Sequence, residues 1–172
     1  MIPKESKAMP RPLRGIDQAL PIALLRARET TLRKFKPHLD AVGLSVQQWR
    51  VIRALAENAT MTASELADRC VVLPSSMTRI LNSLIERGLV APAQDDDGRR
   101  RSVRLTRVGA AIYDRMAANS EAIYALIEQR FSTAKMDQLL ALLEQLRKAA
   151  DTIPRDDLPP VVPSPTGGTA DR

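Results

Sequence analysis

Apolar residues recur at three- and four-residue spacings over most of residues 16–153, which is the pattern of amphipathic helices. The first helix is expected over residues 16–39, with Pro21 in its first turn, where a missing N–H costs little. Pro37 indicates a kink or the start of the helix end, and Gly43 terminates the element. The apolar pattern therefore predicts one long helix as the first element.

Two capping boxes predict where the next two helices begin. Ser45 stands three residues before Gln48, and Thr62 stands three residues before Glu65. In this arrangement the Ser or Thr hydroxyl accepts a hydrogen bond from the backbone N–H three residues on. The Gln or Glu side chain at that position accepts one from the backbone N–H of the cap residue. A further helix is expected over residues 74–87, because it opens on a proline and is followed by a glycine.

The periodicity changes after this helix. Residues 89–91 are apolar and residues 102–105 alternate polar with apolar, which predicts a two-stranded hairpin joined by a polar turn around Gly98. Thr106 then caps a long helix, and a break near Ser132 separates it from the last one. The apolar residues of the last helix are Met136, Leu139, Leu140, Leu142, Leu143 and Leu146. A face this wide needs a partner, either the first helix or a second subunit.

The composition agrees with a mainly helical chain. Only 3% of the 172 residues are aromatic, so the core has to be built from Leu, Ile, Val, Ala and Met. The fold class expected is mainly α with a small β-hairpin wing, in the order of a winged helix-turn-helix.

The charge favours a polyanionic partner. Residues 151–172 hold two Arg and four Asp, a net charge of −2, so the +6 of the whole chain leaves +8 on residues 1–150. A basic body of this kind is typical of nucleic-acid binding, although a basic surface without a partner has the same composition.

Several classes of function are disfavoured. One Cys and one His exclude an internal disulfide and cannot supply a usual zinc site, and neither a catalytic triad nor a phosphate-binding loop is present. We therefore expect no enzyme activity, no cofactor and no metal. No signal peptide or membrane-spanning run is recognisable, so a cytoplasmic protein without a membrane partner is expected.

The helix at residues 74–87 carries the side chains expected to read DNA. In a helix-turn-helix the second helix enters the major groove of double-stranded DNA. Hydroxyls suit phosphate oxygens, Arg suits guanine and Asn suits adenine. The residues assigned to this role are Ser75, Ser76, Thr78, Arg79 and Asn82. The alternative is that the two serines merely cap the helix and the arginine is a solvated charge.

The hairpin supplies the second set of candidates. Asp97 stands two residues before Arg99 and is placed to hold an arginine extended. Arg99 or Arg101 is then expected to enter a narrow minor groove, where the negative potential is deepest. A charged, solvated turn is the alternative.

With these motifs in this order, the chain resembles the MarR family of bacterial repressors. The resemblance is carried by LPSSMTRILNSLIERGLV at residues 73–90, the D-x-R pattern at Asp97 and Arg99, and LTRVGAAIYDR at residues 105–115. Within the family, IALLRARE at residues 22–29 and LSVQQWRVIRAL at residues 44–55 are most similar to regulators of homoprotocatechuate and hydroxyphenylacetate breakdown.

The resemblance implies domain boundaries and partners. The Pro-rich, charged composition of the two ends predicts a disordered basic arm at residues 1–15 and a disordered Pro-rich tail at residues 154–172. The resemblance places a MarR-type domain between them, at residues 16–153. Within the domain, the winged helix-turn-helix spans about residues 45–105, and the dimerisation helices span about residues 16–42 and 106–153. The resemblance also implies a homodimer, a palindromic operator and release by a small aromatic acid effector, often phenolic.

The residues suited to such an effector are Arg28, Arg26, His38, Trp49 and Arg53. A carboxylate needs a guanidinium fork, a phenol can hydrogen-bond imidazole, and indole offers a flat face. Arg28 is the first choice, although it can also pair with Glu29. Trp49 is better suited to the core than to a pocket wall, and His38 is as well suited to the surface as to a ligand contact.

Two other functions remain open. Cys70 could make the chain a redox-sensing repressor, although its position at the end of the short helix favours burial. A non-specific architectural DNA-binding protein is the second alternative, and it would lack a preferred site.

Overall fold

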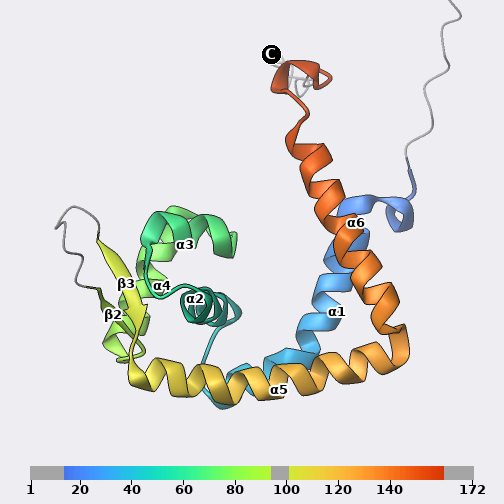
Figure 1. Cartoon of the computed structure of the whole chain (residues 1–172). Coiled ribbons are helices and arrows are strands. Elements are labelled where there is room, and N and C mark those ends of the chain that lie inside the picture. Colours follow the sequence, from blue (N-terminus) through green and yellow to red (C-terminus); the bar gives the residue numbers. More distant parts are fainter. Residues whose placement is uncertain (1–13, 94–100, 161–172) are drawn as a thin grey trace, which may run out of the picture. The chain divides into compact units, whose positions relative to one another are not determined.

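The computed structural model of this chain describes residues 14–93 and 101–160 (Figure 1). The chain forms two compact units, Met1–Ile123 and Tyr124–Arg172, and the boundary between them falls within one long helix. Residues 1–13 of the predicted arm, residues 161–172 of the predicted tail and the tip of the predicted wing lie outside the described residues. The described part of the predicted tail contains the 3-10 helix η2 (Arg155–Asp157).

The first unit contains five helices in its described part and a small antiparallel sheet. The helices are η1 (Ile16–Gln18), α1 (Leu20–Ala41), α2 (Val46–Glu57), α3 (Ala63–Cys70) and α4 (Pro74–Glu86), and they are followed by the start of α5 (Arg107–Phe131). The strands β1 (Met61–Thr62), β2 (Val90–Pro92) and β3 (Ser102–Leu105) form a sheet in the order β1-β3-β2. The fold class expected from the sequence, mainly α with a small wing, is confirmed.

Both predicted capping boxes are present. The Ser45 hydroxyl accepts the Gln48 N–H at 3.1 Å, and the Gln48 side chain accepts the Ser45 N–H at 2.9 Å. Thr62 and Glu65 repeat the arrangement at the start of α3. The first helix differs from expectation, because α1 begins only at Leu20 and continues through Pro37 to Ala41.

The sheet has one strand more than the sequence predicts. The two-stranded hairpin is present as β2 and β3, which lie side by side (Figure 1). On its other edge β3 pairs with β1, where Met61 faces Val103 and Thr62 faces Ser102. A strand of two residues has no alternation to recognise, and here it runs directly into the capping box of α3, so its pairing had no local signal.

One core joins the elements of the first unit. The side chains that are buried with almost no exposure are Leu39, Val51, Ile52, Leu66, Met77, Leu84 and Val90. Met116 of α5 belongs to the same cluster, and the rings of Trp49 and Tyr113 stack with centroids 5.9 Å apart. The core therefore packs against the buried face of α4 and links this helix to α2, to the sheet and to the first half of α5.

A close backbone contact fixes the start of α5. The Thr106 hydroxyl accepts the Gly109 N–H at 3.0 Å and donates to the Gly88 carbonyl at 2.7 Å. A Cβ at position 109 would stand 2.1 Å from the carbonyl oxygen of Leu89. Only glycine allows this approach, so the end of α4, the start of β2 and the first turn of α5 meet at one point.

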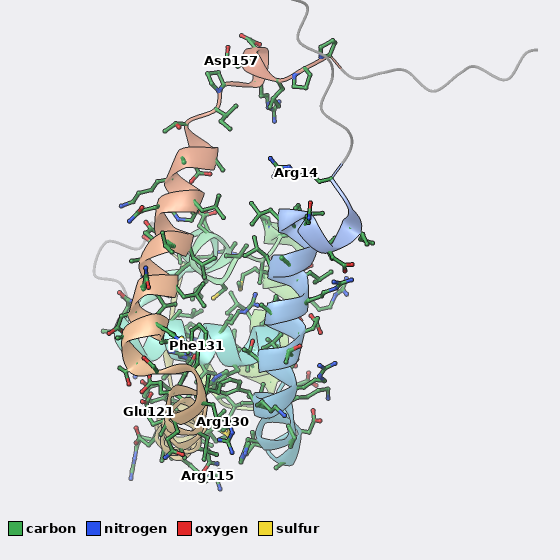
Figure 2. The ribbon with its side chains drawn as sticks, turned by 90° about the vertical axis from the view of Figure 1, so that its right-hand side faces the viewer. Arg14, Arg115, Glu121, Arg130, Phe131 and Asp157 are labelled. Atoms are coloured by element: carbon green, nitrogen blue, oxygen red, sulfur yellow. The ribbon has the colours of Figure 1, made fainter. Side chains whose placement is uncertain are left out.

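The second unit contains the rest of α5, α6 (Thr133–Asp151) and η2. Ser132 lies between the two helices with φ +77° and caps α6, and the labelled Phe131 ends α5 (Figure 2). On α6, Arg147 bonds Glu144 at 2.8 Å, and this hydrogen bond lowers the pKa of Glu144 to about 2. No residue of α6 is buried, although the helix is rich in leucine. None of the described helices combines the length and the hydrophobicity of a membrane-spanning segment.

The junction at Gly109 makes a stability prediction. Gly109→Ala should lower the free energy of unfolding by about 2 kcal/mol or more, because the backbone of α5 must move away from Leu89. Alanine would otherwise favour a helix by roughly 0.5–1 kcal/mol. The matched control is Gly15→Ala, where nothing lies within 4 Å of the added Cβ. Urea unfolding of both variants measures this free energy. Equal free energies of unfolding for the two variants would contradict the prediction.

Candidate DNA interface

The helix α4 separates a buried face from a polar one. Met77, Leu81 and Leu84 are buried at spacings of four and three residues, so they share one side of the helix. The five residues predicted to read DNA are Ser75, Ser76, Thr78, Arg79 and Asn82. All are exposed except Ser76, which is half-buried. The structure therefore brings this set together on one element, with the polar side chains outside the core.

The start of α4 has no side-chain cap. The cap residue is Leu73 and Pro74 occupies the first turn, so Ser75 and Ser76 lie inside the helix. The alternative that these serines cap the helix is therefore wrong. Their hydroxyls stand beside the positive end of the helix dipole, a position that favours a phosphate oxygen.

Two contacts that sequence reasoning missed hold α4 in place. Arg87 donates to the Gly43 carbonyl at 2.8 Å and to the Val42 carbonyl at 3.1 Å. The Gln48 amide donates to the Ser83 hydroxyl at 3.1 Å. These partners lie 35 to 45 positions apart in the chain, so no local pattern indicates them. They tie the last turn of α4, and the residue that follows it, to α2 and to the loop before α2.

The wing is described only at its base. Arg101 directly precedes β3 and is exposed, and Arg104 within β3 is exposed as well. Asp97 and Arg99 lie outside the described residues, so their predicted roles at the tip stay predictions. The base of the wing thus presents two arginines close in sequence, of which Arg104 was not among the predicted residues.

The five predicted effector residues differ in their surroundings. Trp49 is buried in the core against Tyr113, His38 is half-buried, and Arg53 is exposed. Arg26 pairs with Asp17 at 2.5 Å, and Arg28 pairs with Glu29. The observed pairs include the Arg28–Glu29 contact that the sequence offered as an alternative.

Arg28 nevertheless lines a hollow in the first unit. The hollow has a volume of about 470 Å³, and its wall includes Arg28 of α1, Val46 and Arg50 of α2, and Ser76 of α4. None of the other four predicted effector residues lines it. Arg50, which sequence reasoning missed, also donates to the Cys70 carbonyl at 3.1 Å. Two guanidinium groups beside apolar walls suit a small organic anion.

Cys70 is buried at the end of α3. Burial raises the pKa of its thiol, although the charges of Arg50 and Arg69 act in the opposite direction. A raised pKa leaves little thiolate, which is the reactive form. Across residues 14–93 and 101–160, no group of three His, Cys, Asp or Glu side chains is placed to hold a metal ion.

Comparison with known proteins gives a consistent result. The sequence model of the MarR family matches residues 42–101. The homoprotocatechuate degradative operon repressor of Escherichia coli is 40% identical over 128 residues, which cover 74% of this chain and 86% of the repressor. The transcriptional regulator FarR of Neisseria gonorrhoeae is 34% identical over 143 residues, which cover 83% of this chain and 98% of the regulator.

Solved structures agree with these sequences. The structure of NadR in complex with 4-hydroxyphenylacetate matches with a TM-score of 0.70 at 34% identity, over 77% of this chain and 98% of NadR. These relatives are transcriptional regulators, which confirms the expectation that the chain is no enzyme. The resemblance drawn from the sequence is also confirmed: this chain belongs to the MarR family and is a transcriptional repressor of the winged helix-turn-helix type.

Proposed function

We propose that this chain is a dimeric, sequence-specific repressor that binds a palindromic operator and is released by a small aromatic acid. It would act in the cytoplasm and control an operon for aromatic catabolism. The observation that carries the proposal is the polar face of α4, whose uncapped N-terminus lies beside serine hydroxyls, in a chain of the MarR family. Each part of the proposal rests on separate residues.

Operator reading is assigned to α4 and the wing. Arg79 and Asn82 are exposed one helical turn apart, and these side chains pair with guanine and adenine in the major groove. Ser75, Ser76 and Thr78 would hold phosphates and set the register of the helix. The wing residues Asp97, Arg99 and Arg101 would add a minor-groove contact. Base-reading side chains favour a specific repressor over an architectural protein.

The dimer is assigned to the apolar faces of α6 and α1. Leu140 and Leu142 of α6 are 58% and 52% exposed, and Leu25 of α1 is 50% exposed. Leucines exposed in this number on two helices carry a free-energy cost in water that a second copy of the chain would remove. Two copies related by a two-fold axis would present two α4 helices, which requires a palindromic operator.

Release is assigned to an aromatic acid bound at Arg28. The hollow at Arg28 and Arg50 offers two cationic donors, and NadR, a relative by structure, was solved with 4-hydroxyphenylacetate. The E. coli relative represses a homoprotocatechuate operon. A ligand that binds better when the two α4 helices are spaced to miss successive major grooves shifts the dimer away from DNA. Trp49, Arg53, His38 and Arg26 remain candidates for a second set of contacts.

Base reading predicts a loss of specificity in two variants. Arg79→Ala and Asn82→Ala should each cost about 1–3 kcal/mol on a preferred duplex and much less on a scrambled one. Arg115→Ala on α5, which removes an equal exposed charge elsewhere (Figure 2), is the control and should keep the preference. Fluorescence anisotropy with a duplex selected from a randomised library measures both. A wild-type chain without any sequence preference would favour the architectural alternative instead.

Effector control predicts a selective effect at Arg28. In the wild type, 4-hydroxyphenylacetate, homoprotocatechuate or a related acid should raise the Tm and weaken operator binding. Arg28→Ala should weaken the response to that acid about tenfold or more, because a charge-assisted bond is lost, and leave operator binding without acid unchanged. Arg33→Ala, an exposed arginine on the same helix, is the matched control. Equal responses from the two variants would contradict the role of Arg28.

Burial of Cys70 predicts an unreactive thiol. Iodoacetamide should modify the native chain much more slowly than the urea-unfolded chain at neutral pH, since burial raises the thiol pKa. Mild peroxide should leave operator affinity unchanged, in the wild type as in Cys70→Ser. Rapid native alkylation together with peroxide-induced release would favour the redox-sensing alternative.

A further inference from the structure

The turn between α3 and α4 contains a valine in an unfavourable backbone conformation. Val71 has φ +53° and ψ +57°, the left-handed region. Among the described residues other than glycine, only Ser132 shares a positive φ. A β-branched side chain is an outlier in this region, whereas glycine occupies it without a steric penalty. The backbone at position 71 thus favours glycine, and the sequence places valine there.

The conformation itself is needed to end α3. The Val71 N–H donates to the Asp68 carbonyl at 3.2 Å, and the next N–H, of Val72, donates to Ala67 at 3.0 Å. This pair of bonds closes the helix in the way that glycine usually does. Glycine would make both bonds equally well, so the hydrogen bonding does not explain the side chain.

Packing does not explain the side chain either. Val71 is 84% exposed, and Leu73, two positions on, is 73% exposed, whereas Val72 between them packs against the core. Both exposed side chains lie at the edge of the hollow assigned to the effector, where Ser76 also lines the wall. Two exposed apolar side chains therefore stand at the start of α4, beside Ser76, one of the residues assigned to operator reading.

We propose that Val71 is a specificity-determining residue, whose methyl groups pack against the C5-methyl group of a thymine in the major groove. The proposal rests on the proposed function, because it assumes that the start of α4 enters that groove. The thymine methyl is the apolar group among the base-edge features by which the major groove distinguishes base pairs, so it is the partner that an exposed valine there can recognise. Backbone strain retained at a binding surface is typical of functional positions.

The test removes the apolar group from each side of the contact, which is the C5-methyl group of thymine on the DNA and the whole valine side chain on the protein. A duplex is selected by the wild-type chain from a randomised library, without added aromatic acid, and each thymine is replaced in turn by uracil. At one thymine per half-site, uracil should weaken wild-type binding about fourfold, the value of one buried methyl group. Val71→Gly should bind the unsubstituted duplex at least fourfold more weakly and show no further loss with uracil at that thymine.

Controls separate this proposal from folding and from the proposed function. Val71→Gly should have a Tm equal to or above that of the wild type, because glycine adopts the left-handed conformation freely. Val108→Ala, which truncates an exposed valine on α5, should keep the uracil profile of the wild type. The role of Val71 is overturned if Val71→Gly keeps the full uracil sensitivity, or if no uracil affects the wild type. A wild-type chain that selects no sequence at all would instead overturn the proposed function.

Discussion

The carbonyl oxygen of Leu89 stands 2.1 Å from the position that a side chain at residue 109 would need. This contact places the first turn of α5 against the base of the wing. The Thr106 hydroxyl adds two hydrogen bonds there, because it accepts the Gly109 N–H and donates to the carbonyl of Gly88, just after α4. The segment after α4, the sheet and the first turn of α5 therefore meet at one point. Helix α5 continues from this point through the first unit and into the second.

Helix α4 is likewise held in place by contacts on its buried side. Its inner face is buried in the core through Met77 and Leu84, and hydrogen bonds of Ser83 and Arg87 fix its C-terminal end to α2 and to the loop before α2. Its outer face carries short polar side chains and one arginine, and its N-terminus lacks a capping side chain. A helix held this firmly from behind can place a few polar groups accurately in a groove, which is what base reading demands.

The sequence predicted those features that depend on neighbours in the chain. The capping boxes at Ser45 and Thr62 and the polar face of α4 follow from spacings of three or four residues, and each is present. The strand β1, the Arg87 contacts and the Arg28–Arg50 hollow join distant segments, so no local pattern revealed them. Val71 escaped notice for a different reason, because its sequence surroundings resemble an ordinary apolar run and only the backbone angle marks it.

The central claim is that two α4 helices of a dimer enter successive major grooves of one operator. Hydroxyl-radical footprinting of the selected duplex tests it most directly. The account predicts two protected segments related by a two-fold axis on one face of the DNA, with centres about 10–10.5 base pairs, or a multiple of one turn, apart. A single asymmetric footprint, or uniform protection along the duplex, would contradict it.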